Sequence, residues 1–434
     1  MAALRDALPA SGFFAEKEWL HSPEPFPLSP RTFRELEALG PRLHRFLRAA
    51  NTIHQRSLKG TLPPWIAAVT DTGKPEALLE IARDTRQIDA LPRVIRPDLV
   101  LTEDGFALTE IDAVPGGIGL TAWLGKLHAG LAGDDAGVIG GATGMLDGFA
   151  SIFPGDRPVE IAVSAESADY RPEMEWLAGE LGNQWSVVPA ETAAPGGASV
   201  YRFFELFDLP NLPGAPALAE AALRGEIDLT APFKPFLEEK SWLALFWMRP
   251  LQEIWRRELR DSHWRKLREI IPYGWVVDPA PLPHHAVLPR LDLQDFRELA
   301  HLSQTERNLV LKISGFSELG WGSRSVRIGS DLSQSEWAAA VERALSDFPE
   351  HPHILQEFHP GRLVEHPFWN DATDRLEILR GRVRLCPYYF VSARERNRVR
   401  LGGVLATVCP ADKKILHGMR DAILVPCAVR EDGY

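Results

Sequence analysis

The chain has 434 residues, of which 45% are hydrophobic and 25% charged, and its formal net charge is −11 at pH 7. This length can form two or three globular domains with a large core, and the acidic balance argues against a nucleic-acid-binding protein. The three cysteines, Cys386, Cys409 and Cys427, are too far apart for paired zinc ligands and too few for a disulfide framework, so we expect a cytoplasmic protein.

The N-terminal ninety residues are predicted to be mostly helical. The first thirty residues lack the basic start and continuous apolar segment of a signal peptide, and no window approaches the roughly 18 apolar residues of a membrane span. Ser29 followed by Pro30 is a helix start, because serine caps free N–H groups and proline tolerates the first helical position. Gly40-Pro41 is expected to break this helix, after which the apolar residues again repeat at helical spacing.

A β-hairpin is predicted for residues 99–112, "LVLTEDGFALTEID", with its turn at Asp104-Gly105. Glu110 and Asp112 lie two residues apart on the second strand, so their carboxylates point to the same face. Two interpretations stay open for them. They could form a solvated strand edge, or they could hold a metal ion beside the glycines that follow at positions 116, 117 and 119.

The middle of the chain predicts a small α/β unit followed by helices. Strands are expected at 157–164, 185–189 and 200–207, with a helix at 174–181 between the first two. The tryptophan-rich segment after them is predicted to be helical, with apolar faces that carry Trp242, Leu245, Phe246 and Trp255. Four prolines between 279 and 289 indicate a linker.

Beyond the linker the pattern is again mixed. Residues 308–315, "NLVLKISG", read as a buried strand, and Ser333 with Glu336 forms a capping box that starts a helix. A further strand, "HILQEF" (353–358), and a hairpin within "LEILRGRVRLCPYYF" (376–390) are expected to follow.

Three features together indicate a protein that handles ATP. They are Lys312 before the glycine-containing loop "SGFSELGWGS", the strand that ends in Gln356-Glu357, and the Glu110 and Asp112 pair. Glycine lets backbone N–H groups approach phosphates, lysine adds a positive charge, and Mg²⁺ accepts carboxylate oxygens together with phosphates. Each feature alone has an ordinary structural explanation, such as a strand-end lysine whose ammonium reaches water.

In this order the features resemble the circularly permuted ATP-grasp ligases. The likeness is to the glutathionylspermidine synthetase domain and, more distantly, to eukaryotic glutathione synthetase. The family's "R-x-D … E-x-N" hairpin is similar to "RPDLVLTEDGFALTEID", which matches Arg96, Asp98, Glu110 and Asp112. Asp112 stands where the family has asparagine.

The nucleotide motifs of that family extend the resemblance to about residue 400. The family's lysine-bearing helix resembles "EEKSWLALFW", which implies an ATP lysine at Lys240, and its lysine strand and loop imply Lys312 and the metal ligand Glu318. Gly320 and Gly322 would approach the phosphates, and Gln356 and Glu357 would meet the adenine. Arg324 is the candidate replacement for an arginine that the family carries in this loop.

A strict two-residue turn at Asp104-Gly105 would place Asp98 opposite Ile111 and so facing away from Glu110. Either a bulge intervenes, or Asp98 has a structural role.

The resemblance implies an α/β (α+β) ATP-grasp fold in three parts. Residues 1–150 would hold the N-terminal helices and the metal hairpin, residues 151–215 an inserted substrate domain, and residues 216–434 the nucleotide-binding part. Residues 315–322 and the arginine-rich segment 393–407 are candidate lids, and Arg396, Arg398 and Arg400 could bind a carboxylate or simply be solvated.

The implied activity is ADP-forming amide synthesis with ATP and Mg²⁺, in which Arg96, Asp98 and Arg324 would be the catalytic residues. The substrates would be a small carboxylic acid and an amine, such as an amino acid, peptide or polyamine, and the protein could be a homodimer. Two alternatives remain: a phosphotransferase on the same fold and a non-catalytic nucleotide-binding protein.

Overall fold

The computed structural model describes residues 18–132, 137–193, 195–283, 286–320, 323–396, 398–418 and 420–434. These residues form two compact units, each built from separate stretches of the chain. Unit 1 takes its described residues from Met1–His44, Asp84–Phe233 and Pro360–Tyr434, and unit 2 from Arg45–Arg83 and Lys234–His359. The three-part division expected from the sequence stays a prediction.

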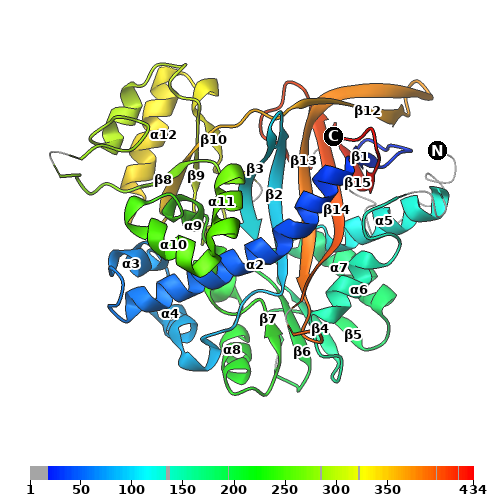
Figure 1. The fold of residues 1–434 in the computed structure, drawn as a ribbon. Coiled ribbons are helices and arrows are strands. Elements are labelled where there is room, and N and C mark those ends of the chain that lie inside the picture. Colours follow the sequence, from blue (N-terminus) through cyan, green and yellow to red (C-terminus); the bar gives the residue numbers. More distant parts are fainter. Residues whose placement is uncertain are drawn as a thin grey trace. The chain divides into compact units, whose positions relative to one another are not determined.

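The N-terminal region is largely helical, as predicted. It forms α2 (Pro30–Leu58), α3 (Trp65–Asp71) and α4 (Glu76–Arg83), and the long α2 is the blue helix of Figure 1. The expected break at Gly40-Pro41 is wrong, because Pro41 lies inside α2, which continues for four further turns.

Gly40 has a packing role in unit 1 instead. A Cβ atom at this position would lie 2.4 Å from Cδ1 of Tyr389, so only glycine lets the helix approach that ring. The Tyr389 hydroxyl donates a hydrogen bond of 2.6 Å to the backbone oxygen of Leu36, one turn earlier in the helix. The close approach fixes α2 against the strand that carries Tyr389.

Unit 1 contains a seven-stranded sheet with the order β1-β15-β14-β13-β2-β3, and β12 also pairs with β13. Its strands are β1 (Phe26–Leu28), β2 (Val94–Thr102), β3 (Gly105–Asp112), β12 (Leu363–Asn370), β13 (Arg375–Val391), β14 (Val399–Pro410) and β15 (Ile423–Val429). The predicted hairpin is therefore β2 and β3, although its turn residues are Glu103 and Asp104, one position earlier than expected.

The hairpin predicted inside residues 376–390 is wrong. This stretch is part of β13, a single strand of 17 residues that pairs with β12 through its first half and with β2 through its second half. Gly381 lies where a Cβ atom would be 2.2 Å from the backbone oxygen of Cys409. The glycine allows close contact with β14 rather than a reversal of the chain.

The small α/β unit predicted in the middle of the chain is confirmed. Unit 1 contains a parallel sheet with the order β5-β4-β6-β7. Its strands are β4 (Val159–Val163), β5 (Trp185–Pro189), β6 (Ser199–Phe203) and β7 (Leu229–Thr230), and the helices of this region are α5 (Ile118–Ala132), α6 (Gly144–Ser151), α7 (Arg171–Leu181) and α8 (Ala215–Leu223).

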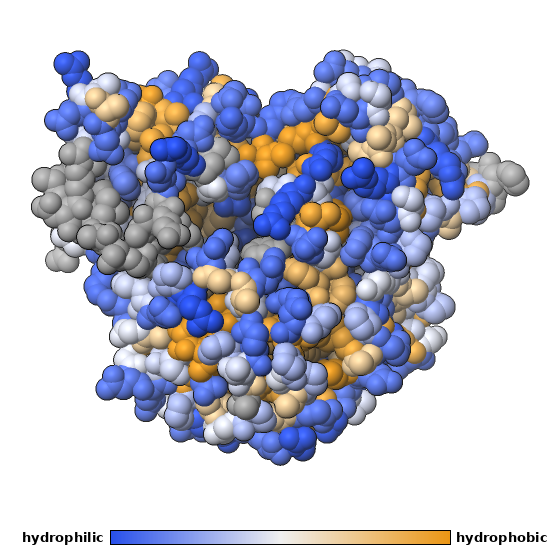
Figure 2. Space-filling model, turned by 180° about the vertical axis from the view of Figure 1, so that it is seen from behind, coloured by the Kyte–Doolittle hydropathy of each residue, from blue (hydrophilic) through white to orange (hydrophobic). Residues whose placement is uncertain are grey.

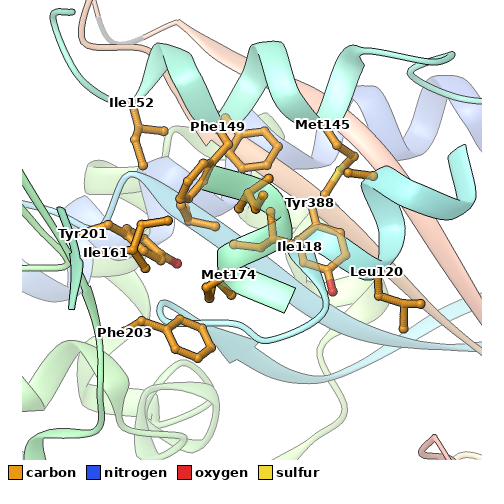
Figure 3. Close-up of a cluster of buried hydrophobic side chains, with 14 of the residues drawn as sticks. Ile118, Leu120, Met145, Phe149, Ile152, Ile161, Met174, Tyr201, Phe203 and Tyr388 are labelled. Carbon is orange, nitrogen blue, oxygen red and sulfur yellow. The ribbon is translucent and has the colours of Figure 1, made fainter. Parts of the chain in front are cut away.

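One hydrophobic core of unit 1 joins these elements to the large sheet. Figure 3 shows Met145 and Phe149 of α6, Met174 of α7 and Tyr201 of β6 gathered in one cluster with Tyr388 of β13. These side chains are buried, so the cluster fixes β13 and thereby the polar residues that alternate along it.

Unit 2 is built around a four-stranded antiparallel sheet with the order β10-β9-β11-β8. Its strands are β8 (Gly274–Val277), β9 (Leu309–Ile313), β10 (Arg327–Ile328) and β11 (His353–Glu357), and the helices that follow unit 1 in the chain are α9 (Ser241–Leu245), α10 (Gln252–Leu259), α11 (Asp261–Ile270) and α12 (Gln334–Ser346). The capping box of Ser333 and Glu336 starts α12 as predicted. Strand β8 was missed because it has only four residues and lies in the short stretch between α11 and the prolines that begin at Pro279.

The surface is of the ordinary kind for a globular protein. The face shown in Figure 2 carries mainly hydrophilic residues with hydrophobic patches between them. Among the helices whose residues are described, none combines the length and the apolar character that crossing a membrane requires.

Candidate functional site

The hairpin of unit 1 contains a bulge that decides where its acidic side chains point. Asp98 lies opposite Glu110 and Arg96 opposite Asp112, whereas Leu99 lies opposite Leu108, so Thr109 is an extra residue in β3. Opposite residues of an antiparallel pair project from the same face. The bulge thus resolves the geometric conflict seen in the sequence, because it brings Asp98 and Glu110 to one face.

Five charged residues meet on this face, and we call them the charged face: Arg96, Asp98, Glu110, Asp112 and Arg384. Arg96 Nε lies 3.1 Å from Asp98 Oδ1, and its Nη2 lies 3.1 Å from Asp112 Oδ2. Arg384 of β13 donates from Nη1 to Asp98 Oδ2 at 2.8 Å. The two guanidiniums thus hold Asp98 from both sides.

Burial and charge shift the pKa values of these groups in different directions. Burial alone would raise the pKa of Asp98, but Arg384 and Arg96 outweigh it and lower that pKa. Burial raises the pKa of Asp112, and the neighbouring Glu110 adds to the rise against the opposing effect of Arg96. The two arginines therefore stabilise the charged form of Asp98, whereas an additional positive charge would favour the charged form of Asp112.

Several neighbours of the charged face could not be identified from the sequence. Cys386 lies with its Sγ atom 3.5 Å from Asp98 Oδ1, and burial raises the pKa of its thiol to about 12. The Tyr388 hydroxyl and Arg96 Nη1 both donate to the backbone oxygen of Gly116, at 2.8 and 3.3 Å. Arg384, Cys386 and Tyr388 alternate along the sequence, which would have placed them on one face of a strand. The hairpin expected within residues 376–390 interrupted that pattern.

The two predicted ATP lysines lie in unit 2, at the base of the glycine-containing loop. The backbone N–H of Lys240 donates to the Ser314 carbonyl at 2.9 Å, and Lys312 lies two residues before Ser314 on β9. Lys240 Nζ donates to the backbone oxygen of Gly320 at 3.0 Å. Both lysines are largely buried, with Lys240 9% and Lys312 5% exposed.

A buried ion pair supports this loop and was also missed from the sequence. Lys74 Nζ lies 2.6 Å from Glu239 Oε1, and the side chains are 0% and 1% exposed. The Ser314 hydroxyl donates to the other oxygen of Glu239 and accepts from the backbone N–H of Ser241 at 2.8 Å. Glu239 thereby connects the segment that carries Lys240 to the start of the loop.

The other predicted residues of unit 2 have distinct positions. Gln356 is 2% exposed, and its Nε2 atom is buried without a hydrogen-bond partner among the described residues. Both oxygens of Glu357 accept from Nη1 of Arg290, at 2.8 and 2.9 Å. Glu318 and Arg324 are exposed in the loop after β9, and Gly322 lies outside the described residues.

The arginine-rich segment does not behave as the expected lid. From Val399 onward it is β14, which pairs with both β13 and β15. Arg398 and Arg400 both form ion pairs with Glu395, so the solvated alternative describes them better than a carboxylate site. Cys409 and Cys427 are buried free thiols.

Within the described residues, no three histidine, cysteine, aspartate or glutamate side chains are grouped closely enough to hold a metal ion. A hard cation at the charged face would therefore need oxygen atoms from a substrate besides those of Glu110 and Asp112. Magnesium is commonly bound in this way, by one or two carboxylates together with phosphates and water.

No protein-family model matches the chain, and no curated protein matches it in sequence. Among solved structures, a glutathione synthetase-like effector from Globodera pallida, in its apo form, aligns with a TM-score of 0.51. The alignment covers 95% of this chain and 90% of that chain at 10% identity. The chain shares the fold of that protein.

A candidate gamma-glutamylcysteine synthetase from Methylobacillus flagellatus KT aligns with a TM-score of 0.40 at 13% identity, over 86% of each chain. The likeness to the glutathione synthetase-like effector extends over almost the whole chain and agrees with the mixed α/β fold expected from the sequence.

Proposed function

We propose that the protein is an ATP-dependent carboxylate–amine ligase of the circularly permuted ATP-grasp type, similar to the glutathionylspermidine synthetase domain. The observation that carries the proposal is the charged face, where a bulge turns Glu110 and Asp112 to the same side as Arg96 and Asp98. The synthetase-like fold and the two lysines at the base of the loop support it.

The charged face suits a magnesium ion held by Glu110 and Asp112. Both are carboxylates on one face of β3, and burial, with a smaller contribution from Glu110, raises the pKa of Asp112, so a cation there would favour its charged form. Asp98 already pairs with Arg96 and Arg384, so its proposed role is to hold these two side chains in position. Magnesium bound there would neutralise charge on phosphate oxygens.

The chain's own residues would perform the remaining tasks. Lys240 and Lys312 would neutralise the phosphates of ATP while the substrate carboxylate attacks the γ-phosphorus and ADP leaves. The amine would then attack the acyl phosphate, and phosphate would leave as the amide bond forms. Arg96 and Arg324 are the proposed binding groups for the anionic parts of the substrates. The Gln356 amide, a buried donor, is the proposed partner of the adenine.

The first experiment measures phosphate release from ATP and Mg²⁺ with pools of amino acids, small peptides and polyamines, and identifies the product by mass. We expect release that needs both a carboxylate and an amine, together with an amide product. Glu110→Gln and Lys312→Met should each abolish it. Glu103→Gln, in the exposed turn of the same hairpin, is the matched control and should leave it unchanged.

Other outcomes would replace the proposal. A stable phosphorylated product without phosphate release would show a phosphotransferase. Binding of ATP without turnover in any pool would show a non-catalytic nucleotide-binding protein.

A further inference from the structure

Unit 2 contains a cavity of about 910 Å³ beside β8, the edge strand of its sheet. Its walls come from α3, the segment around Trp247, α11, β8 and the loop after β8. None of Lys240, Lys312, Gln356 or Glu357 lines it. Cavities of this size bind drug-sized molecules, so this one is a candidate site outside the proposed ATP residues.

Three aromatic rings form a fixed wall of the cavity. Trp247 and Tyr273 have ring centroids 4.8 Å apart, and Tyr273 and Trp275 have centroids 5.0 Å apart. The indole N–H of Trp247 donates to the Pro272 carbonyl at 2.9 Å, and that of Trp275 donates to the Pro289 carbonyl at 3.0 Å. Because these polar atoms are satisfied, the rings are held in place and present carbon surface to a ligand.

The cavity is positively charged, although the whole chain carries −11. The charged residues that line it are Arg249, Arg268 and Asp278. Asp278 already accepts from the backbone N–H of Ala280 at 2.8 Å. Neither Arg249 nor Arg268 has an ion pair or hydrogen bond from its guanidinium within the described part of the chain, and Arg268 lies 4.9 Å above the Trp247 ring.

We propose that this cavity binds a multi-ring aromatic carboxylate. The rings would lie against Trp247 and Tyr273, and the carboxylate would accept hydrogen bonds from Arg268 and Arg249. Arg290, 4.2 Å above the Tyr273 ring, is not available for this role because Glu357 binds it. The inference is independent of the ligase activity, since it uses none of the residues assigned to ATP or metal.

The charge argument is tested by calorimetric titration of the full-length protein with pyrene-1-butyrate and, as the neutral match, pyrene-1-butanol. We expect the acid to bind at least about tenfold more tightly than the alcohol, as one charge-assisted hydrogen bond would give. Arg268→Gln should remove this preference. Arg265→Gln, on the same helix but outside the cavity, should keep it.

The location is tested by filling the cavity. Val69→Trp, on the lining face of α3, should abolish binding of both compounds, whereas Ala68→Trp, on the exposed face of the same helix, should not. Lys312→Met should leave binding unchanged, which separates this site from the proposed ATP site. The proposal is overturned if neither compound binds, if the alcohol binds as tightly as the acid, or if a circular dichroism spectrum like that of the wild type accompanies undiminished binding to Val69→Trp.

Discussion

Asp98 shows how single residues set the character of the charged face. Its side chain is 9% exposed and lies between two guanidiniums, which compensate the cost of burying a carboxylate. Asp112 is also held, by Arg96 at Oδ2 and by the backbone N–H of Val114 at Oδ1. Our proposal divides the three nearby carboxylates between two roles: Asp98 fixes the arginines, and Glu110 and Asp112 are the proposed metal ligands.

Removal of Arg384 should lower the stability of the protein, because the buried Asp98 then loses one of its two cations. Arg384→Met takes away the 2.8 Å hydrogen bond to Asp98 and leaves Arg96 as its remaining cation, so we expect a loss of about 2 kcal/mol in the free energy of unfolding. Urea denaturation measures it. Arg380→Met changes an exposed arginine of the same strand and is the control. Equal effects of the two substitutions would refute a special role for Arg384.

The Lys74 and Glu239 pair permits a double-mutant test in unit 2. Glu239→Leu leaves a buried ammonium unpaired and should destabilise the protein by about 3 kcal/mol or more, and Lys74→Met should do the same to the carboxylate. The double variant should recover most of the loss, since two apolar side chains of similar size need no partner. Additive losses in denaturant unfolding would show that the pair is not coupled.

At the scale of elements, the bulge in β3 accommodates Thr109 and so determines the face on which Glu110 and Asp112 lie. Deletion of Thr109 would leave a regular ladder in which Glu110 follows Leu108 and still lies opposite Asp98, so the two acids keep their face. We expect this variant to retain Mg²⁺-dependent binding of ATP in calorimetry, whereas deletion of Ile111, which turns Asp112 to the opposite face, should lose it. Equal Mg²⁺ dependence in the two folded deletion variants would contradict this.

The sequence predicted elements well where the local pattern determines them. The β2–β3 hairpin, the capping box of α12 and the strands carrying Lys312 and Gln356 all follow from short-range signals. The prediction from sequence failed where a residue distant in the chain determines the local structure. A break was expected at Gly40-Pro41 and a hairpin within residues 376–390, yet the glycines there, Gly40 and Gly381, allow a ring and a neighbouring backbone to approach closely. The bulge at Thr109 could be suspected but not located, since register depends on the neighbouring strand.

At the scale of the whole molecule, the chain passes between the two units four times, at residues 44/45, 83/84, 233/234 and 359/360. No composition change marks these points, and the first of them lies inside α2. Lys74 and Glu239 meet although 164 residues separate them in the sequence, so the supporting shell of the loop could not be read from any local motif. Local motifs therefore suggest candidate site residues, but they do not identify the residues that support them.

Two buried histidines should make the unfolding of the molecule sensitive to acid. Burial lowers the pKa of His128 and of His366 to about 4, whereas both return to about 6.5 when the chain unfolds. The unfolded state then binds more protons, so stability is full above pH 6.5 and is lost as the pH falls toward 4. From pH 7 to 5 each histidine should cost about 2 kcal/mol.

Substitution separates these histidines from the many carboxylates of the chain. His128 Nε2 is buried without a hydrogen-bond partner among the described residues, so His128→Leu should fold and should flatten part of the decline. His366→Gln keeps a donor near the Glu24 carbonyl, 3.2 Å from His366 Nε2, and should act similarly. The exposed His301→Asn is the control. Carboxylates with lowered pKa values, such as Asp98 and Asp71, lose their contribution only below about pH 4. Denaturation midpoints that fall equally between pH 7 and 5 in all three variants and the wild type would assign the acid sensitivity to other groups.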